Sequence, residues 1–96
     1  MTIYKLQFLE SAQKEWSKLD NTVRSQLKRK LAERLENPRV ESARLSTMPD
    51  CYKIKLAASG YRLVYQVADR TVTVTVISVG KRERSAVYAA AIARLM

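Results

Sequence analysis

Three cationic side chains lie at alternating positions on two neighbouring predicted strands, a spacing that suits the binding of an anion. In residues 51–56, Lys53 and Lys55 alternate with apolar residues, so both point to one face of the strand. After a turn at Ser59-Gly60, the next strand brings Arg62 to the same face. Like charges side by side on a sheet cost stability. We therefore expect these cations to hold an anion, for which phosphate is the obvious candidate.

The rest of the C-terminal half extends this set without adding metal ligands. The chain has no His, and only Asp69 and Glu83 are acidic after residue 50. This composition excludes a His-based nuclease site and is too poor in carboxylates for a two-metal site, so we expect no metal and no other cofactor. The candidates for chemistry are Lys53, Lys55, Arg62, Lys81, Arg82, Arg84 and Tyr88.

Such a cluster can cleave RNA because the substrate carries its own nucleophile, the 2′-hydroxyl. A lysine beside other cations loses its proton more readily than a free lysine and can then act as a base. An arginine can stabilise the extra negative charge that develops on the phosphate. A tyrosine can stack on a base or exchange a proton.

The same residues also have simpler interpretations. Lys53 and Lys55 can be the solvated face of a one-sided antiparallel sheet. The run of three cations from residue 28 to residue 30 can be the solvated face of a helix rather than a contact with RNA. Trp16 is expected in the core, and Cys51, which has no His partner, is expected to be structural.

The overall charge points to an acidic partner. The 96 residues include 18 Lys and Arg against nine Asp and Glu, which gives a net charge of +9. From residue 51 onward there are eight basic and two acidic residues, so the C-terminal half should produce most of the positive field. A chain of this kind favours nucleic acid or an acidic protein as its partner.

A length of 96 residues indicates one small domain over residues 1–96. The single Cys cannot form an internal disulfide, and the N-terminus lacks the pattern of a secretory signal. No apolar run approaches the roughly 20 residues that a membrane span needs. We therefore expect a cytoplasmic protein that does not associate with membranes.

Periodicity predicts an α+β fold with the order β-α-α-β-β-β-α. Two successive helices should form a hairpin that packs against an antiparallel central sheet, and a short third helix should end the chain. The strands should be joined by turns of two to three residues. The expected segments are a strand at 3–8, a helix at 10–19, a helix from its cap at 20–22 to the stop at 37–38, strands from 51, from 61 and at 71–79, and a helix at 85–95.

Four stretches of the chain together resemble the RelE branch of the RelE/ParE toxin superfamily along nearly the whole length. A Lys-x-Lys strand, a Gly-Tyr-Arg turn and a basic turn followed by a Tyr are typical of the catalytic branch. The stretches are Lys14-Glu15-Trp16, Met48-Pro49-Asp50-Cys51-Tyr52-Lys53-Ile54-Lys55-Leu56, Ser59-Gly60-Tyr61-Arg62-Leu63-Val64-Tyr65-Gln66-Val67 and Val76-Ile77-Ser78-Val79-Gly80-Lys81-Arg82-Glu83-Arg84-Ser85.

The resemblance implies the toxin of a type II toxin–antitoxin pair. Such a toxin is a ribosome-dependent endoribonuclease that cuts mRNA in the ribosomal A site and stops translation. Its implied partners are the ribosome, mRNA and a small acidic RelB-like antitoxin, with operator DNA bound, and the operon repressed, only through the toxin–antitoxin complex. The alternative function is a non-catalytic ParE-like toxin or a basic module that binds nucleic acid.

The family pattern also implies a role for each site residue. By analogy, Lys53 is the first candidate for the base and Tyr88 the alternative. Lys55 and Arg62 would hold the phosphate, Arg82 would stabilise or protonate the leaving oxygen, and Tyr88 would stack on a base. Contacts with ribosomal RNA are expected from Arg24, Lys28, Arg29, Lys30, Arg44, Lys81 and Arg84.

The chain departs from the family pattern at two positions outside this cluster. Ser46 and Ala57 stand where the pattern has basic residues. Two missing cations should weaken contact with ribosomal RNA, while the five proposed active-site positions remain filled.

Overall fold

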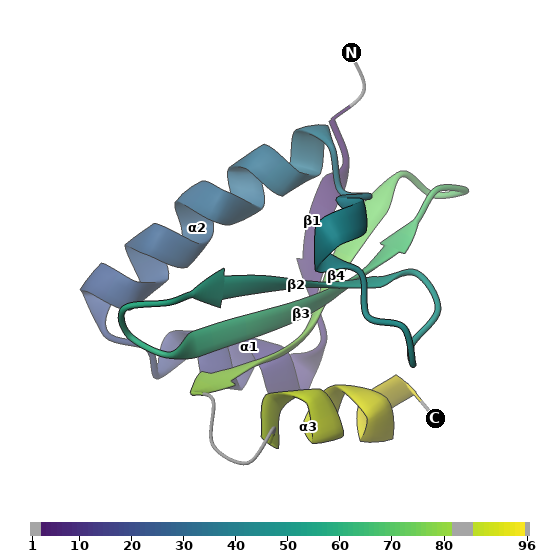
Figure 1. The fold of residues 1–96 in the computed structure, drawn as a ribbon. Coiled ribbons are helices and arrows are strands. Elements are labelled where there is room, and N and C mark those ends of the chain that lie inside the picture. Colours follow the sequence, from purple (N-terminus) through teal and green to yellow (C-terminus); the bar gives the residue numbers. More distant parts are fainter. Residues whose placement is uncertain (1–2, 82–85, 96) are drawn as a thin grey trace.

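A computed structural model describes residues 3–81 and 86–95 of the chain. It contains a four-stranded sheet with helices on both faces (Figure 1). The predicted order of helices and strands is confirmed, with one short 3-10 turn added before the second strand. The elements are β1 (Lys5–Phe8), α1 (Glu10–Ser17), α2 (Asn21–Glu36), η1 (Glu41–Ala43), β2 (Cys51–Leu56), β3 (Tyr61–Ala68), β4 (Thr73–Lys81) and α3 (Ala86–Leu95).

The sheet is mixed, with strand order β1-β4-β3-β2. Strands β2, β3 and β4 form the predicted antiparallel centre. Strand β1 pairs with β4 in parallel at one edge. Parallel pairing requires a long connection between the strands, and here the two helices and two central strands supply it.

One face of the sheet packs against α1 and α2. Val23, Leu27 and Leu31 of α2 are buried together with apolar side chains of all three central strands. The phenyl ring of Phe8 lies 5.3 Å from the ring of Trp16, which is only partly buried at the rim of this core. The helical hairpin therefore covers this face, as predicted.

Helix α3 covers part of the opposite face, on the other side of the sheet from α2 (Figure 1). Its residues Val87 and Ala91 are buried against Cys51, Val64 and Ile77 of the strands. The face that carries the lysines is therefore not simply solvated. The apolar part of this face, formed by Cys51, Val64 and Ile77, packs against α3.

A β-bulge in β4 contributes to this contact with α3. The register between β3 and β4 shifts between Val64 and Tyr65, so that Val64 pairs with Ser78 while Tyr65 pairs with Val76. Ile77 therefore has no partner on β3. Its side chain packs with Val87 and Ala91 of α3, in what we call the α3 cluster. The neighbouring Ser78 hydroxyl donates a 2.7 Å hydrogen bond to the backbone oxygen of Val87. The extra residue thus sends two consecutive side chains toward α3.

Both hairpin loops are longer than predicted. The connections at residues 57–60 and 69–72 each have four residues, so the expectation of two to three was wrong. Gly60 has φ +76°, which a glycine adopts without strain, and its N–H donates to the Leu56 oxygen at 2.9 Å. Val72 has φ +51°, a left-handed conformation that is unfavourable for a β-branched residue.

Side chains at the start of α2 join the two helices. The carboxylate of Asp20 caps α2 by accepting from the Thr22 N–H at 3.1 Å. Helix α1 ends at Ser17, two residues earlier than predicted. The Arg24 guanidinium donates to the backbone oxygens of Trp16 and Ser17, each at 3.4 Å, and so satisfies carbonyls at the end of α1.

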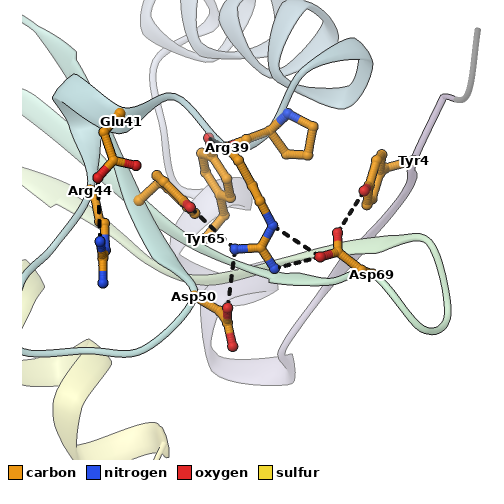
Figure 2. Close-up of polar contacts among 9 residues, drawn as sticks. Tyr4, Arg39, Glu41, Arg44, Asp50, Tyr65 and Asp69 are labelled. Atoms are coloured by element: carbon orange, nitrogen blue, oxygen red, sulfur yellow. Dashed lines mark hydrogen bonds and ion pairs between the residues drawn. The ribbon is translucent and has the colours of Figure 1, made fainter.

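Arg39 joins three segments at one end of the sheet (Figure 2). Its guanidinium lies 3.1 Å from the carboxylate of Asp50, before β2, and 2.8 Å from that of Asp69, in the β3–β4 loop. The same guanidinium donates to the Tyr52 hydroxyl at 3.2 Å. Tyr4 donates to Asp69 at 2.6 Å. These contacts hold the loop before β2 against the β3–β4 turn.

None of the helices in residues 3–81 and 86–95 has the length and apolar character needed to span a membrane.

Candidate functional site

The three cations predicted to bind an anion, Lys53, Lys55 and Arg62, lie on two adjacent strands. Lys55 of β2 pairs directly with Arg62 of β3, and Lys53 pairs with Val64 two residues further along. Lys55 is exposed, Lys53 is half-buried and Arg62 is only 9% exposed. The structure therefore brings these cations together on one face, in three different environments.

Arg62 is a buried cation that lacks full hydrogen bonding. Its Nη1 donates to the Tyr88 hydroxyl at 2.9 Å, and its guanidinium carbon lies 5.9 Å from the centre of the Tyr88 ring. Its Nε has no hydrogen-bond partner, and no carboxylate forms an ion pair with it, among the residues that the structure describes. A buried guanidinium normally finds such partners. The arrangement is thus complementary to an anion.

Tyr88 is positioned by contacts at both ends of α3. At the start of the helix, Ser78 donates to the Val87 backbone oxygen. In its last turn, Arg94 donates to the carboxylate of Glu15 at 2.8 and 3.0 Å and to the Ile77 oxygen at 2.7 Å. The hydrogen bonds to Glu15 raise the pKa of Arg94 further above its usual value. Helix α3 is therefore fixed to both α1 and β4.

The backbone of Lys53 is held by Arg34 of α2, a residue that was not among the predicted site residues. Nη1 of Arg34 donates to the Lys53 backbone oxygen at 3.0 Å and to the Tyr65 hydroxyl at 2.9 Å. Tyr65 in turn donates to the Pro38 oxygen at 2.6 Å. Arg34 follows the buried Leu31 by three residues, a helical spacing that points its stem toward the sheet. This spacing could have predicted that Arg34 reaches the sheet.

The remaining predicted RNA-binding residues are spread over several environments, and Lys28 lies beside Leu6 and Phe8 of β1, at the edge of the sheet opposite β2. Lys28, Arg29 and Lys30 are exposed on α2. Arg44 is exposed and pairs with Glu41 at 3.3 Å. The Nζ of Lys81 lies 5.7 Å from the centre of the Tyr61 ring.

The other three predicted RNA-binding residues are Arg24, Arg82 and Arg84. Arg24 is engaged with the end of α1 and is half-buried. Arg82 and Arg84 lie outside the described residues, so their roles stay predictions.

Cys51 has the environment of a structural thiol. It is fully buried in the α3 cluster, and burial raises its pKa to about 11. A thiol of this kind is protonated and unreactive at neutral pH. Among residues 3–81 and 86–95, no three His, Cys, Asp or Glu side chains gather where they could hold a metal ion.

Comparison with known proteins identifies the family of this fold and site. The profile of the ParE toxin of the type II toxin–antitoxin system parDE matches residues 6–86. The chain belongs to this toxin family. Its similarity to RelE proteins confirms the resemblance seen in the sequence motifs. The chain is 64% identical over 93 residues to the mRNA interferase toxin RelE of Escherichia coli K12, which covers 97% of this chain and 98% of that protein.

Other relatives agree with this placement. The mRNA interferase RelE of Shigella flexneri has the same identity and the same coverage. The free E. coli RelE toxin carrying two arginine-to-alanine substitutions has a structure that matches this toxin with a TM-score of 0.92 at 61% identity, over 99% of this chain and 100% of that chain. The intact E. coli RelBE toxin–antitoxin complex contains a chain that matches with a TM-score of 0.82 at 67% identity, over 84% of this chain and 99% of that one.

Proposed function

We propose that this chain is an mRNA interferase, the toxin of a type II toxin–antitoxin pair. Its relatives of 64% identity over nearly the full length bear that name. The observation that carries the proposal is Arg62, a buried guanidinium that lies beside two lysines and leaves a donor free in the described structure. A phosphodiester placed there would pair with this donor and offset the repulsion among the cations.

The reaction follows from the residues around that phosphate. The 2′-oxygen of the RNA attacks the adjacent phosphorus and loses its proton to Lys53, which acts as the base. The bond from phosphorus to the 5′-oxygen of the next nucleotide then breaks, which leaves a cyclic phosphate and a free 5′-hydroxyl. Lys55 and Arg62 stabilise the charge on the phosphate, and Arg82 stabilises or protonates the departing oxygen.

Tyr88 completes the site by stacking on a base. Its hydroxyl is held by Arg62, so the ring has a defined orientation next to the phosphate position. Stacking on an aromatic ring is a common way for proteins to hold an unpaired RNA base. Tyr88 is also the alternative base if Lys53 does not fill that role.

Ribosome dependence follows from how little of the site is enclosed. Lys55 is exposed, and the chain supplies no His and no metal cluster in its described residues to orient free RNA. The ribosomal A site would hold the mRNA codon in place while the +9 chain binds the surrounding ribosomal RNA. The toxin would therefore act in the cytoplasm, as a single domain over residues 1–96.

The partner that restrains the toxin would be an acidic, RelB-like antitoxin. The E. coli RelBE complex contains a relative at 67% identity. A net charge of +9 favours an acidic segment that folds on binding. Repression of the operon would require the complex of toxin and antitoxin on operator DNA.

The test compares cleavage of one message free in solution and on ribosomes with an occupied P site and an empty A site. We expect cuts within the A-site codon and almost none in free RNA. Equal rates in both settings would reject ribosome dependence. Absence of cleavage in both, with ribosome binding retained, would favour the non-catalytic toxin or binding module.

A further inference from the structure

Gly80 is a glycine inside strand β4 whose backbone conformation does not require one. It pairs with Arg62 of β3, and its φ, unlike that of Gly60, lies outside the left-handed region. A glycine within a strand weakens that strand, because it has no side chain to pack and it loses more conformational freedom on folding than other residues do. Another residue at this position should therefore stabilise β4.

Packing does not require a glycine at this position either. A β-carbon on residue 80 would meet no heavy atom within 4 Å among the described residues, its two neighbours in the chain apart. The register shift that forms the bulge lies between the pairs of Val64 and Tyr65, so it ends before Gly80. The remaining common reason for a glycine inside a strand is the close approach of a ligand or of another backbone. Since no described backbone comes that close, Gly80 indicates a ligand.

The ligand would lie at the candidate site, because Gly80 continues a row that contains two of its cations. Lys55 of β2 pairs with Arg62 of β3, and Arg62 pairs with Gly80 of β4. Paired residues on neighbouring strands direct their side chains to the same face of the sheet, with β-carbons about 4.5–5.5 Å apart. A side chain at position 80 would therefore stand next to that of Arg62.

Helix α3 covers the preceding row of this face. Ser78, two residues earlier in β4, is fully buried, and its hydroxyl donates to the Val87 oxygen at 2.7 Å. Gly80 is partly exposed. Tyr88 extends from α3 to Arg62, whose Nη1 donates to the tyrosine hydroxyl at 2.9 Å. The open space over Gly80 thus adjoins Arg62 beside the start of α3.

We propose that Gly80 is a specificity-determining residue that leaves room for the nucleotide on the 3′ side of the cut. The inference rests on the proposed function, since it assigns a place to one part of the RNA that this function cleaves. Arg82, which is proposed to meet the departing 5′-oxygen, follows Gly80 by two residues in the chain. This order places the departing nucleotide over Gly80. A side chain there would occupy the room of its sugar and leave every charge of the site in place.

The test adds carbon atoms to this space without changing a charge. Gly80→Ala adds one carbon and Gly80→Val adds three. Ala68→Val is the matched control, because it adds two carbons to an exposed residue at the other end of the pairing between β3 and β4. All proteins are also compared by thermal unfolding.

Binding is measured to ribosomes that hold one of two messages in the A site. Both messages carry a 2′-deoxy nucleotide at the cleavage position, so that they stay intact. The first continues beyond this position with ordinary nucleotides. The second ends there, with its phosphate as a methyl ester, and so lacks the departing nucleotide.

We expect Gly80→Ala to bind ribosomes with the first message about 10-fold or more weakly than wild type, because one extra carbon in a closely fitted site is typically discriminated by such a factor. Gly80→Val should bind them more weakly still. Both variants should bind ribosomes with the second message as wild type does. Their unfolding midpoints should stay at the wild-type value or rise. Ala68→Val should bind both kinds of ribosome like wild type.

Wild-type affinity of Gly80→Ala for the first message would overturn the proposal, because the RNA would then not use this space. An equal loss with both messages, or a lower unfolding midpoint, would also overturn it, since the added carbon would then disturb Arg62 or the strand itself. These measurements involve no cleavage. If wild type binds both kinds of ribosome but does not cut an all-ribose message, the proposed function fails, while the comparison of the two messages still decides the role of Gly80.

Discussion

Arg94 in the last turn of α3 forms a two-pronged ion pair with Glu15 of α1, at 2.8 and 3.0 Å. The side chains of the pair are only 22% and 33% exposed. Glu15 also accepts from the Val79 N–H at 3.1 Å, and Arg94 donates to the Ile77 oxygen. This pair joins the end of the chain to β4 and α1, and so holds the helix that carries Tyr88.

Arg94→Met should loosen α3 while most of the apolar stem remains. The variant leaves a half-buried carboxylate without its cation, so we expect a loss of about 1–3 kcal/mol in the free energy of unfolding. Hydrogen exchange should speed up in residues 87–95 more than in the central strands. Lys14→Met, an exposed change on α1, is the control. Unchanged exchange in α3 would mean that apolar packing alone holds the helix.

Lys53→Ala should slow single-turnover cleavage on ribosomes by about 100- to 10,000-fold, because it removes the proposed base. It should also change the shape of the pH–rate profile. Lys55→Ala is the comparison, since it removes a neighbouring charge that we expect to bind phosphate without taking the proton. A Lys53→Ala variant that keeps the wild-type profile and most of its rate would contradict the assignment.

Tyr88→Phe separates the two roles proposed for this residue. The ring remains for stacking, but Arg62 Nη1 loses the hydroxyl that accepts its hydrogen bond at 2.9 Å. We expect cleavage on ribosomes to fall by less than about tenfold, and Tyr88→Ala to fall much further. A loss of about 100-fold or more in Tyr88→Phe would instead make the tyrosine the base.

Asp69 should make the fold sensitive to acid. Hydrogen bonds from Tyr4 and from Arg39 lower the pKa of this carboxyl below its usual value. A group with a lowered pKa stabilises the folded state above its unfolded pKa of about 3.9, and that contribution is lost as the pH falls through the folded pKa. Urea unfolding between pH 6 and pH 3 should therefore show less dependence on pH in Asp69→Asn than in wild type.

The control for that experiment is Glu36→Gln, an exposed carboxylate at the end of α2. Its pH dependence should match that of wild type. If Asp69→Asn also matches wild type, then the contacts of Asp69 in Figure 2 do not contribute to acid stability.

Local patterns predicted the order of helices and strands and the grouping of three cations at the candidate site. Alternation set Lys53 and Lys55 on one face of β2, and the short return through Gly60 placed Arg62 beside them. Both features depend on neighbours along the chain, where strand geometry leaves few choices. The ends of α2 also follow from neighbouring residues, because Asp20 caps its start and Pro38 follows its end.

Tertiary structure decided which of these residues are buried and which long-range contacts support them. The parallel position of β1 and the ion pair between Glu15 and Arg94 join residues more than 60 positions apart. The bulge at Ile77 depends on the register in which β3 and β4 pair. The sequence carries no local signal for contacts of this range. Arg62 shows the difference most clearly, because its charge was evident in the sequence, but its burial against Tyr88 exists only once α3 has packed on the sheet.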